Sequence, residues 1–168
     1  QNRGHYLDAP HAGQFARLGQ WLAPREEALF DALGEHLVAF GEWCAARHSL
    51  AYTALPDWWF LFDVYDRRAG PFWNAERRDR WAGGLGLITV PSLLPCRRSL
   101  QELRQLVING RSAFRDGPLE GVVIRREDDS WLQSRAKLVR ADFTQHIAEH
   151  WRHRSLQWNR LDDFAMHD

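Results

Sequence analysis

Residues 120–140 read EGVVIRREDDSWLQSRAKLVR, and this stretch has the pattern of a β-hairpin. Two runs rich in strand-forming residues, 120–126 and 131–139, flank a polar turn at 128–130. Two such runs joined by a short turn favour antiparallel pairing. Arg135 and Lys137 are two residues apart, so on a strand their side chains share one face.

Helices and one short strand are expected before the hairpin. Ser99-Leu-Gln-Glu102 is a capping box that opens a helix, and Asn109-Gly110 ends it. A short strand over 87–90 is expected to end at Pro91, and an amphipathic helix over 74–83 begins at Asn74.

The N-terminal half adds two strands and more helix. The run WWFLFDVY at 58–65 is nearly all apolar, as in a strand buried on both faces, and 37–43 also has a strand pattern. Apolar residues over 14–34 have helical spacing, broken by Pro24. A last amphipathic helix is expected over 142–153. We find no repeat or linker, so the sequence predicts a single α+β domain over residues 1–168.

Composition excludes several classes of protein. The chain has 168 residues, 45% of them hydrophobic and 26% charged, which is typical of a globular domain and not of a disordered one. No apolar run approaches the roughly 20 residues of a membrane span. Two cysteines are too few for a disulfide framework or a four-thiolate zinc site, so a cytoplasmic protein is expected.

The charges argue against binding by general attraction to phosphates. Lys and Arg together number 22, and so do Asp and Glu, so no overall basic field exists. Lys137 is the only lysine in the sequence, and the other basic residues are arginines.

Two carboxylates interrupt apolar strand patterns. Glu42 lies in VAFGEW at 38–43, and Glu120 opens EGVVIR. A carboxylate beside a buried strand needs a partner or a route to solvent. With Arg135 and Lys137 on the next strand, Glu120 would place a metal-binding carboxylate near phosphate-binding cations, as phosphoryl chemistry requires. The alternative is an ordinary cross-strand ion pair.

Four motifs in order resemble the covalent nucleotidyltransferases, which include RNA ligases, DNA ligases and mRNA capping enzymes. They are FGEW at 40–43, FLFDVYD at 60–66, EGVVIR at 120–125 and AKLVR at 136–140. The chain most resembles the ATP-dependent RNA ligase family typified by the phage RNA ligase that seals nicks in duplex RNA. The resemblance implies a mainly antiparallel adenylyltransferase domain.

One motif of that family is missing. The family's nucleophile is the lysine of Lys-x-Asp-Gly, and this sequence contains no such motif. Residues 1–6, QNRGHY, resemble the strand that follows it. The absent initiator methionine and the start within an apparent strand favour an N-terminally truncated domain over a relative that has lost the lysine. Without it, the chain is expected to be inactive.

The resemblance implies the residues that bind the nucleotide. Arg3 would contact the nucleotide or the RNA end, and Glu42 would accept hydrogen bonds from the ribose hydroxyls. The family's phenylalanine directly before an aspartate stacks on adenine, which selects Phe62. Strand alternation predicts that Phe60 shares the face of Phe62, with Leu61 and Asp63 on the opposite face.

The resemblance also implies the catalytic residues. Glu120 would hold the catalytic metal, Mg²⁺ or Mn²⁺. Lys137 would bind the α-phosphate of ATP or AMP, where a compact ammonium is suitable. Arg135 stands where the family usually has another lysine. It keeps the positive charge of that lysine, but its forked guanidinium would contact a phosphate with a different geometry. The implied partners are RNA ends, including nicked duplex RNA, in RNA repair by a monomeric enzyme.

Other functions remained open. A DNA ligase or capping-type enzyme has the same motifs, and a non-catalytic module for nucleotides or RNA ends would lack the lysine. His146-Ile-Ala-Glu-His150 matches an H-x-x-E-H zinc pattern, but the solvated face of an amphipathic helix is the preferred interpretation of these residues. Cys44 near His48 resembles a structural thiol more than a nucleophile. The glycines at 83–86 lack the lysine of a phosphate-binding loop.

Overall fold

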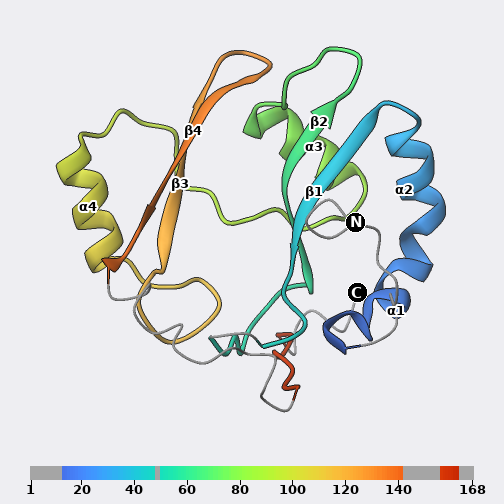
Figure 1. The fold of residues 1–168 in the computed structure, drawn as a ribbon, viewed down its shortest axis with the longest axis horizontal. Coiled ribbons are helices and arrows are strands. Elements are labelled where there is room, and N and C mark those ends of the chain that lie inside the picture. The colour runs from blue at the N-terminus through green and yellow to red at the C-terminus, as the bar shows by residue number, and fades with distance from the viewer. Residues whose placement is uncertain (1–12, 48–49, 142–155, 163–168) are drawn as a thin grey trace.

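The computed structural model describes residues 13–47, 50–141 and 156–162, and within them two antiparallel sheets lie side by side (Figure 1). The first sheet pairs β1 (Leu37–Trp43) with β2 (Trp59–Asp66). The second pairs β3 (Gly121–Glu127) with β4 (Leu132–Val139). The mixed α+β architecture with antiparallel pairing is as predicted.

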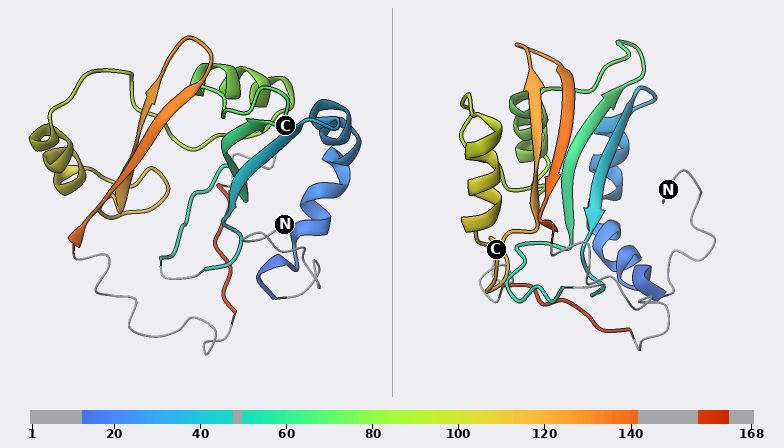
Figure 2. Two further views of the ribbon diagram at one scale, coloured as in Figure 1. Left: turned by 45° about the horizontal axis from the view of Figure 1, so that its top comes forward. Right: turned by 60° about the vertical axis from the view of Figure 1, so that its left-hand side comes forward.

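Helices cover the outer sides of the two sheets (Figure 2). The helices α1 (Leu18–Leu22) and α2 (Glu26–Leu33) lie beside the first sheet, and α4 (Leu100–Asn109) lies beside the second. The helix α3 (Ala75–Gly84) packs against β2. The expected break at Pro24 is confirmed, because a 3₁₀ turn over Ala23–Arg25 separates α1 from α2. Another 3₁₀ turn, Gly13–Phe15, precedes α1.

Side-chain caps set the start of α3 and α4 as the sequence predicts. The Asn74 side chain accepts a hydrogen bond from the Arg77 backbone N–H at 2.9 Å. The Ser99 hydroxyl accepts from the Glu102 backbone N–H, and the Glu102 carboxylate accepts from the Ser99 backbone N–H. Each cap satisfies N–H groups that the first helical turn leaves without a partner.

A β-bulge at Phe62 breaks the alternation of β2. Asp63 pairs with Phe40, Leu61 pairs with Gly41, and Phe62 has no partner in the register. Leu61 and Val64 therefore both enter the core, although they are three residues apart. The prediction that Asp63 shares the face of Leu61 is wrong, because Asp63 bonds instead to arginines of the second sheet.

The hairpin is confirmed, and its register fixes which side chains are neighbours. Arg125 lies opposite Arg135, and Val123 lies opposite Lys137. Arg135 and Lys137 therefore share a face, as expected. The predicted strand at 87–90 is reduced to a single parallel bridge between Thr89 and Leu61, since the chain leaves β2 at Pro91.

The core lies between the first sheet and its helices. Its buried cluster consists of Trp21, Leu61, Val64, Trp73, Ala82 and Leu87. The partly buried tryptophans Trp43, Trp59, Trp81 and Trp131 pack against this cluster. No helix among the described residues is long and apolar enough to cross a membrane. The strand expected at the start of the chain and the helix expected over 142–153, with its His146–His150 pattern, lie outside the described residues.

Candidate functional site

Glu42 lies on the face of β1 that points away from the core. Leu37, Ala39 and Trp43 pack against the core cluster, so alternation places Phe40 and Glu42 on the opposite face. Gly41, between them, is required because a Cβ at this position would overlap the Trp59 indole. Glu42 itself is exposed.

Glu120 stands just before β3, and its carboxylate is bound by a residue from the other half of the chain. The Tyr52 hydroxyl donates a hydrogen bond of 2.5 Å to Oε1 of Glu120. The Glu120 backbone is fixed as well, because its carbonyl accepts from the Arg140 N–H at 3.0 Å. Sequence reasoning missed Tyr52, since it lies in the irregular segment between β1 and β2, where no periodicity or motif marks it.

The pKa of Cys44 is affected by both predicted carboxylates, Glu42 and Glu120. Burial, and then the negative charges of Glu42 and Glu120, raise the pKa of the Cys44 thiol to about 12. Burial and the bond to Glu120 also raise the pKa of Tyr52, which stays a neutral donor. These shifts indicate that Glu42 on β1 and Glu120 next to β3 both lie close enough to Cys44 for their charges to act on its thiol.

Lys137 shares a small pocket with Glu120. The pocket has a volume of about 150 Å³ and is lined by Glu120, Gly121, Val122, Val123, Lys137 and Val139. Lys137 is exposed, and its ammonium has no hydrogen-bond or ion-pair partner within the part of the chain that the structure describes. Glu120 and Lys137, which the sequence analysis expected to lie near each other, therefore line one pocket.

Arg135 differs from Lys137 although the two share a face. Its guanidinium binds Oδ2 of Asp63 and lies 5.0 Å from the centre of the Phe72 ring. These contacts hold it against β2, whereas Lys137 lines the pocket. A role for Arg135 at the phosphate stays a prediction, and its contacts in the structure are those of a side chain that joins the sheets.

The two phenylalanines of β2 also differ. Phe60 is 3% exposed, and its ring centre lies 5.0 Å from that of Phe114. Phe62 is half-buried, and its backbone carbonyl accepts a hydrogen bond of 2.8 Å from Arg78. Phe60 therefore packs in the interior, and Phe62 keeps some surface for another group. Arg3 lies outside the described residues.

Glu120 is suited to a magnesium ion that also binds substrate phosphates, and less to a metal ion coordinated only by protein side chains. Within the described ranges, no group of three His, Cys, Asp or Glu side chains could hold a metal ion. Magnesium keeps most of its waters and binds through one or two carboxylates together with substrate phosphates. Glu120 beside the cationic Lys137, which would attract a phosphate, meets this requirement.

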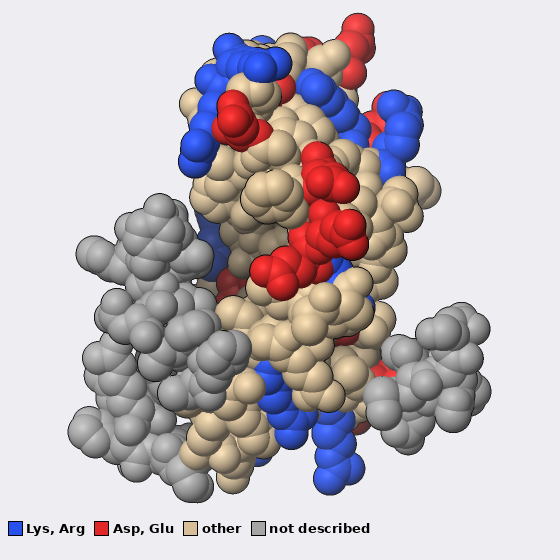
Figure 3. All heavy atoms as spheres, turned by 90° about the vertical axis from the view of Figure 1, so that its right-hand side faces the viewer, with Lys and Arg blue, Asp and Glu red and all other residues tan. Residues whose placement is uncertain are grey.

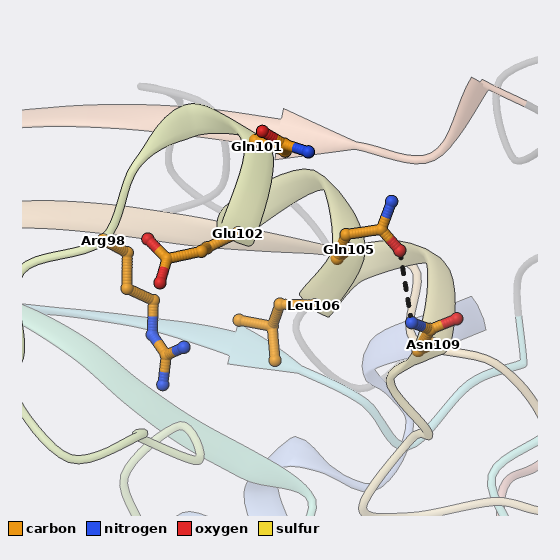
Figure 4. A pocket seen from close by; sticks show the side chains of 6 residues that line it. All are labelled: Arg98, Gln101, Glu102, Gln105, Leu106 and Asn109. Atoms are coloured by element: carbon orange, nitrogen blue, oxygen red, sulfur yellow. Dashed lines mark hydrogen bonds between the residues drawn. The ribbon is translucent and has the colours of Figure 1, made fainter.

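Two other surface features lie apart from these residues. A hollow of about 430 Å³ is lined by Arg98 and by side chains of α4, among them Leu106, and Gln105 and Asn109 are hydrogen-bonded along the helix (Figure 4). No predicted site residue lines it. On the side where α2 lies, acidic side chains gather over the middle of the surface (Figure 3), and α2 exposes Glu26, Glu27 and Asp31. This acidic surface would repel a phosphate backbone.

Comparison with known proteins identifies the protein family of this chain. The family model described as RNA ligase matches residues 1–139. The chain belongs to the RNA ligase family. The matched region contains both sheets and all the residues predicted to form the site. Searches of the curated proteins and of the solved structures found no significant match.

Proposed function

We propose that this RNA ligase family chain is the adenylyltransferase domain of an ATP-dependent RNA ligase, of the type that seals nicks in duplex RNA. The observation that carries the proposal is the pocket that Glu120 and Lys137 share. Glu42, which acts on the same thiol as Glu120, supplies a second carboxylate from the facing sheet. This arrangement is suited to binding a nucleotide through its ribose and its phosphate together.

Each side chain then has a separate task. Glu42 accepts hydrogen bonds from the ribose hydroxyls, and Phe62 stacks on adenine. Lys137 neutralises the α-phosphate oxygens, where negative charge develops during transfer. Glu120 holds a Mg²⁺ or Mn²⁺ ion, which would lower the charge on the phosphates when bound. Arg3, for which the family resemblance is the support, contacts the nucleotide or the RNA end.

The proposed reaction has three steps. The amine of the nucleophilic lysine attacks the α-phosphorus of ATP, so that a P–N bond forms and pyrophosphate leaves. An oxygen of the RNA 5′-phosphate then attacks the same phosphorus, which breaks the P–N bond and gives an RNA–adenylate anhydride. Finally the 3′-hydroxyl attacks the RNA 5′-phosphorus, loses its proton, and expels AMP.

The presence or absence of the nucleophilic lysine distinguishes this proposal from a non-catalytic binding module. The encoding frame upstream of Gln1 is read for Lys-x-Asp-Gly, and the full-length protein is incubated with radiolabelled ATP and Mg²⁺. We expect a covalent AMP adduct and sealing of nicked duplex RNA. Binding of ATP without an adduct would favour the non-catalytic module, and preferential sealing of nicked DNA would favour a DNA ligase.

Residues 1–168 alone provide a control. Their only lysine is Lys137, which lies in the motif expected to contact the α-phosphate and not in Lys-x-Asp-Gly. We therefore expect no mass increase of one AMP on this chain with ATP and Mg²⁺. Such an increase would show that Lys137 or another group is the nucleophile, and would overturn the assignment of Lys137.

A further inference from the structure

Tyr52 is the one described residue that bonds to the side chain of Glu120. Its hydroxyl donates to Oε1 at 2.5 Å, and Oε2 bonds to none of the residues that the structure describes. Tyr52 is therefore a hydrogen-bond donor to one oxygen of the carboxylate.

A segment near the C-terminus holds the Tyr52 loop in place. Residues 156–162 run along the segment that joins β1 to β2 (Figure 1). The Asn159 side chain is central: it accepts from the Tyr52 N–H at 2.9 Å and donates to the Cys44 carbonyl at 2.8 Å. The Arg160 N–H donates to the Tyr52 carbonyl at 3.1 Å. Both sides of the Tyr52 backbone are thus fixed.

This support comes from outside the region that matches the family. The RNA ligase match ends at residue 139, whereas Asn159 lies beyond it and is 5% exposed. A buried amide with all its hydrogen bonds directed at one loop fixes that loop in a single conformation. The conformation it fixes is the one that brings the Tyr52 hydroxyl to Glu120.

We propose that Tyr52 is a positioning residue for the metal-binding carboxylate of Glu120, and that Asn159 holds Tyr52 in place. The inference rests on the proposed function, because it takes Glu120 as the metal ligand. By occupying Oε1, the phenol restricts the rotation of the carboxylate, so that Oε2 would be the oxygen that binds the ion. Partners of this kind set the orientation of a ligand before the metal arrives.

The test measures Mn²⁺ binding to the full-length protein by electron paramagnetic resonance, together with the melting temperature. Tyr52→Phe removes only the hydroxyl, and we expect Mn²⁺ affinity to fall by roughly 10-fold to 100-fold, as is typical when such a partner is lost. Asn159→Ala should weaken binding in the same direction. Tyr65→Phe is the matched control, because the Tyr65 hydroxyl has no hydrogen-bond partner among the described residues, and it should bind Mn²⁺ normally.

Glu120→Gln separates this inference from the proposed function. If Glu120→Gln loses Mn²⁺ and Tyr52→Phe retains it at wild-type affinity, the positioning role is overturned and the metal site stands. If Glu120→Gln binds Mn²⁺ normally, the metal assignment fails and the inference fails with it. If Tyr52→Phe does not fold, Tyr52→Met repeats the test without a hydroxyl. Failure of both to fold would make the phenol a structural requirement and overturn the proposal.

Discussion

Arg125 on β3 joins the two sheets by donating a hydrogen bond of 2.5 Å from Nη1 to Oδ1 of Asp63 on β2. The Asp63 side chain is 1% exposed, and Arg135 binds its other oxygen. Burial alone lowers the pKa of Arg125, but the bonds to Asp63 and Glu127 outweigh it and raise this pKa. One buried carboxylate thus holds both strands of the hairpin against the first sheet.

We expect Asp63→Ala to destabilise the fold strongly. The change removes the buried carboxylate partner of Arg125 and leaves this side chain paired with Glu127, and losing one partner of a buried ion pair costs about 3–5 kcal/mol. Denaturant unfolding measures the loss. Glu76→Gln is the control, because Glu76 and Arg80 are paired in solvent and such a pair contributes about 0–1 kcal/mol. Equal unfolding midpoints for Asp63→Ala and wild type would show that other contacts hold the sheets together.

Glu42→Ala and Glu120→Ala should each abolish ligation by the full-length protein. Each removes a carboxylate from the proposed nucleotide site, and losses on the order of 10²–10³ in rate are typical when such a group is removed. The fold should survive, because Glu42 is exposed and Glu120 is only partly buried. Glu27→Ala, on the acidic surface of α2, should seal nicked RNA normally. Sealing by either site variant at the wild-type rate would make that carboxylate structural.

Local patterns predicted most of the elements. The Asn74 cap, the Ser99–Glu102 capping box and the hairpin depend on residues close in sequence, so the printed sequence contains the information for them. The bulge at Phe62 could not be predicted, because it depends on how β1 and β2 pair. Because of this bulge, the Asp63 side chain lies on the face of β2 opposite to the one expected.

The candidate site was predicted only in part, because its motifs can be found in the sequence but the contacts between distant residues cannot. Motif order indicated Glu120 and Lys137, and the structure places them in one pocket. The partner of Arg135 is Asp63, 72 residues earlier, and the donor to Glu120 is Tyr52, 68 residues earlier. Contacts over such separations arise from the packing of the two sheets, and no periodicity in the sequence reports them.

Cys44 should resist alkylation at neutral pH. Its pKa is raised to about 12, so at pH 8 only about one thiol in ten thousand is the reactive thiolate. We expect iodoacetamide to modify the exposed Cys96 first, and the Cys44 rate to rise as pH increases toward 12. Mass spectrometry of the digested protein measures both sites.

The same reaction tests whether Glu120 lies near Cys44. Glu120→Gln removes one negative charge that raises the Cys44 pKa, so alkylation of Cys44 should become faster at a given pH. Glu27→Gln should leave the rate unchanged. An unchanged rate in Glu120→Gln would contradict the common environment of the two carboxylates.

Phe62 is expected to stack on adenine, and Phe60 is expected to stabilise the fold. A bulge redirects a side chain from the regular strand, and Phe62 stands at that position, half-buried. Stacking on a nucleobase is worth about 1–3 kcal/mol by alanine substitution. We therefore expect Phe62→Ala in the full-length protein to weaken ATP binding by that amount, while Phe62→Trp retains most of it because another flat ring can stack.

Phe60→Ala provides the contrast on the same strand. Its ring is buried against Phe114, so truncation should cost about 3–5 kcal/mol of stability, as for other buried phenylalanines. Calorimetric ATP titrations and melting temperatures of the three variants separate the two roles. If Phe62→Ala melts early yet binds ATP normally, the ring serves packing and adenine must be recognised elsewhere. If Phe62→Ala keeps its melting temperature and loses ATP affinity, the bulge has directed this side chain to the base.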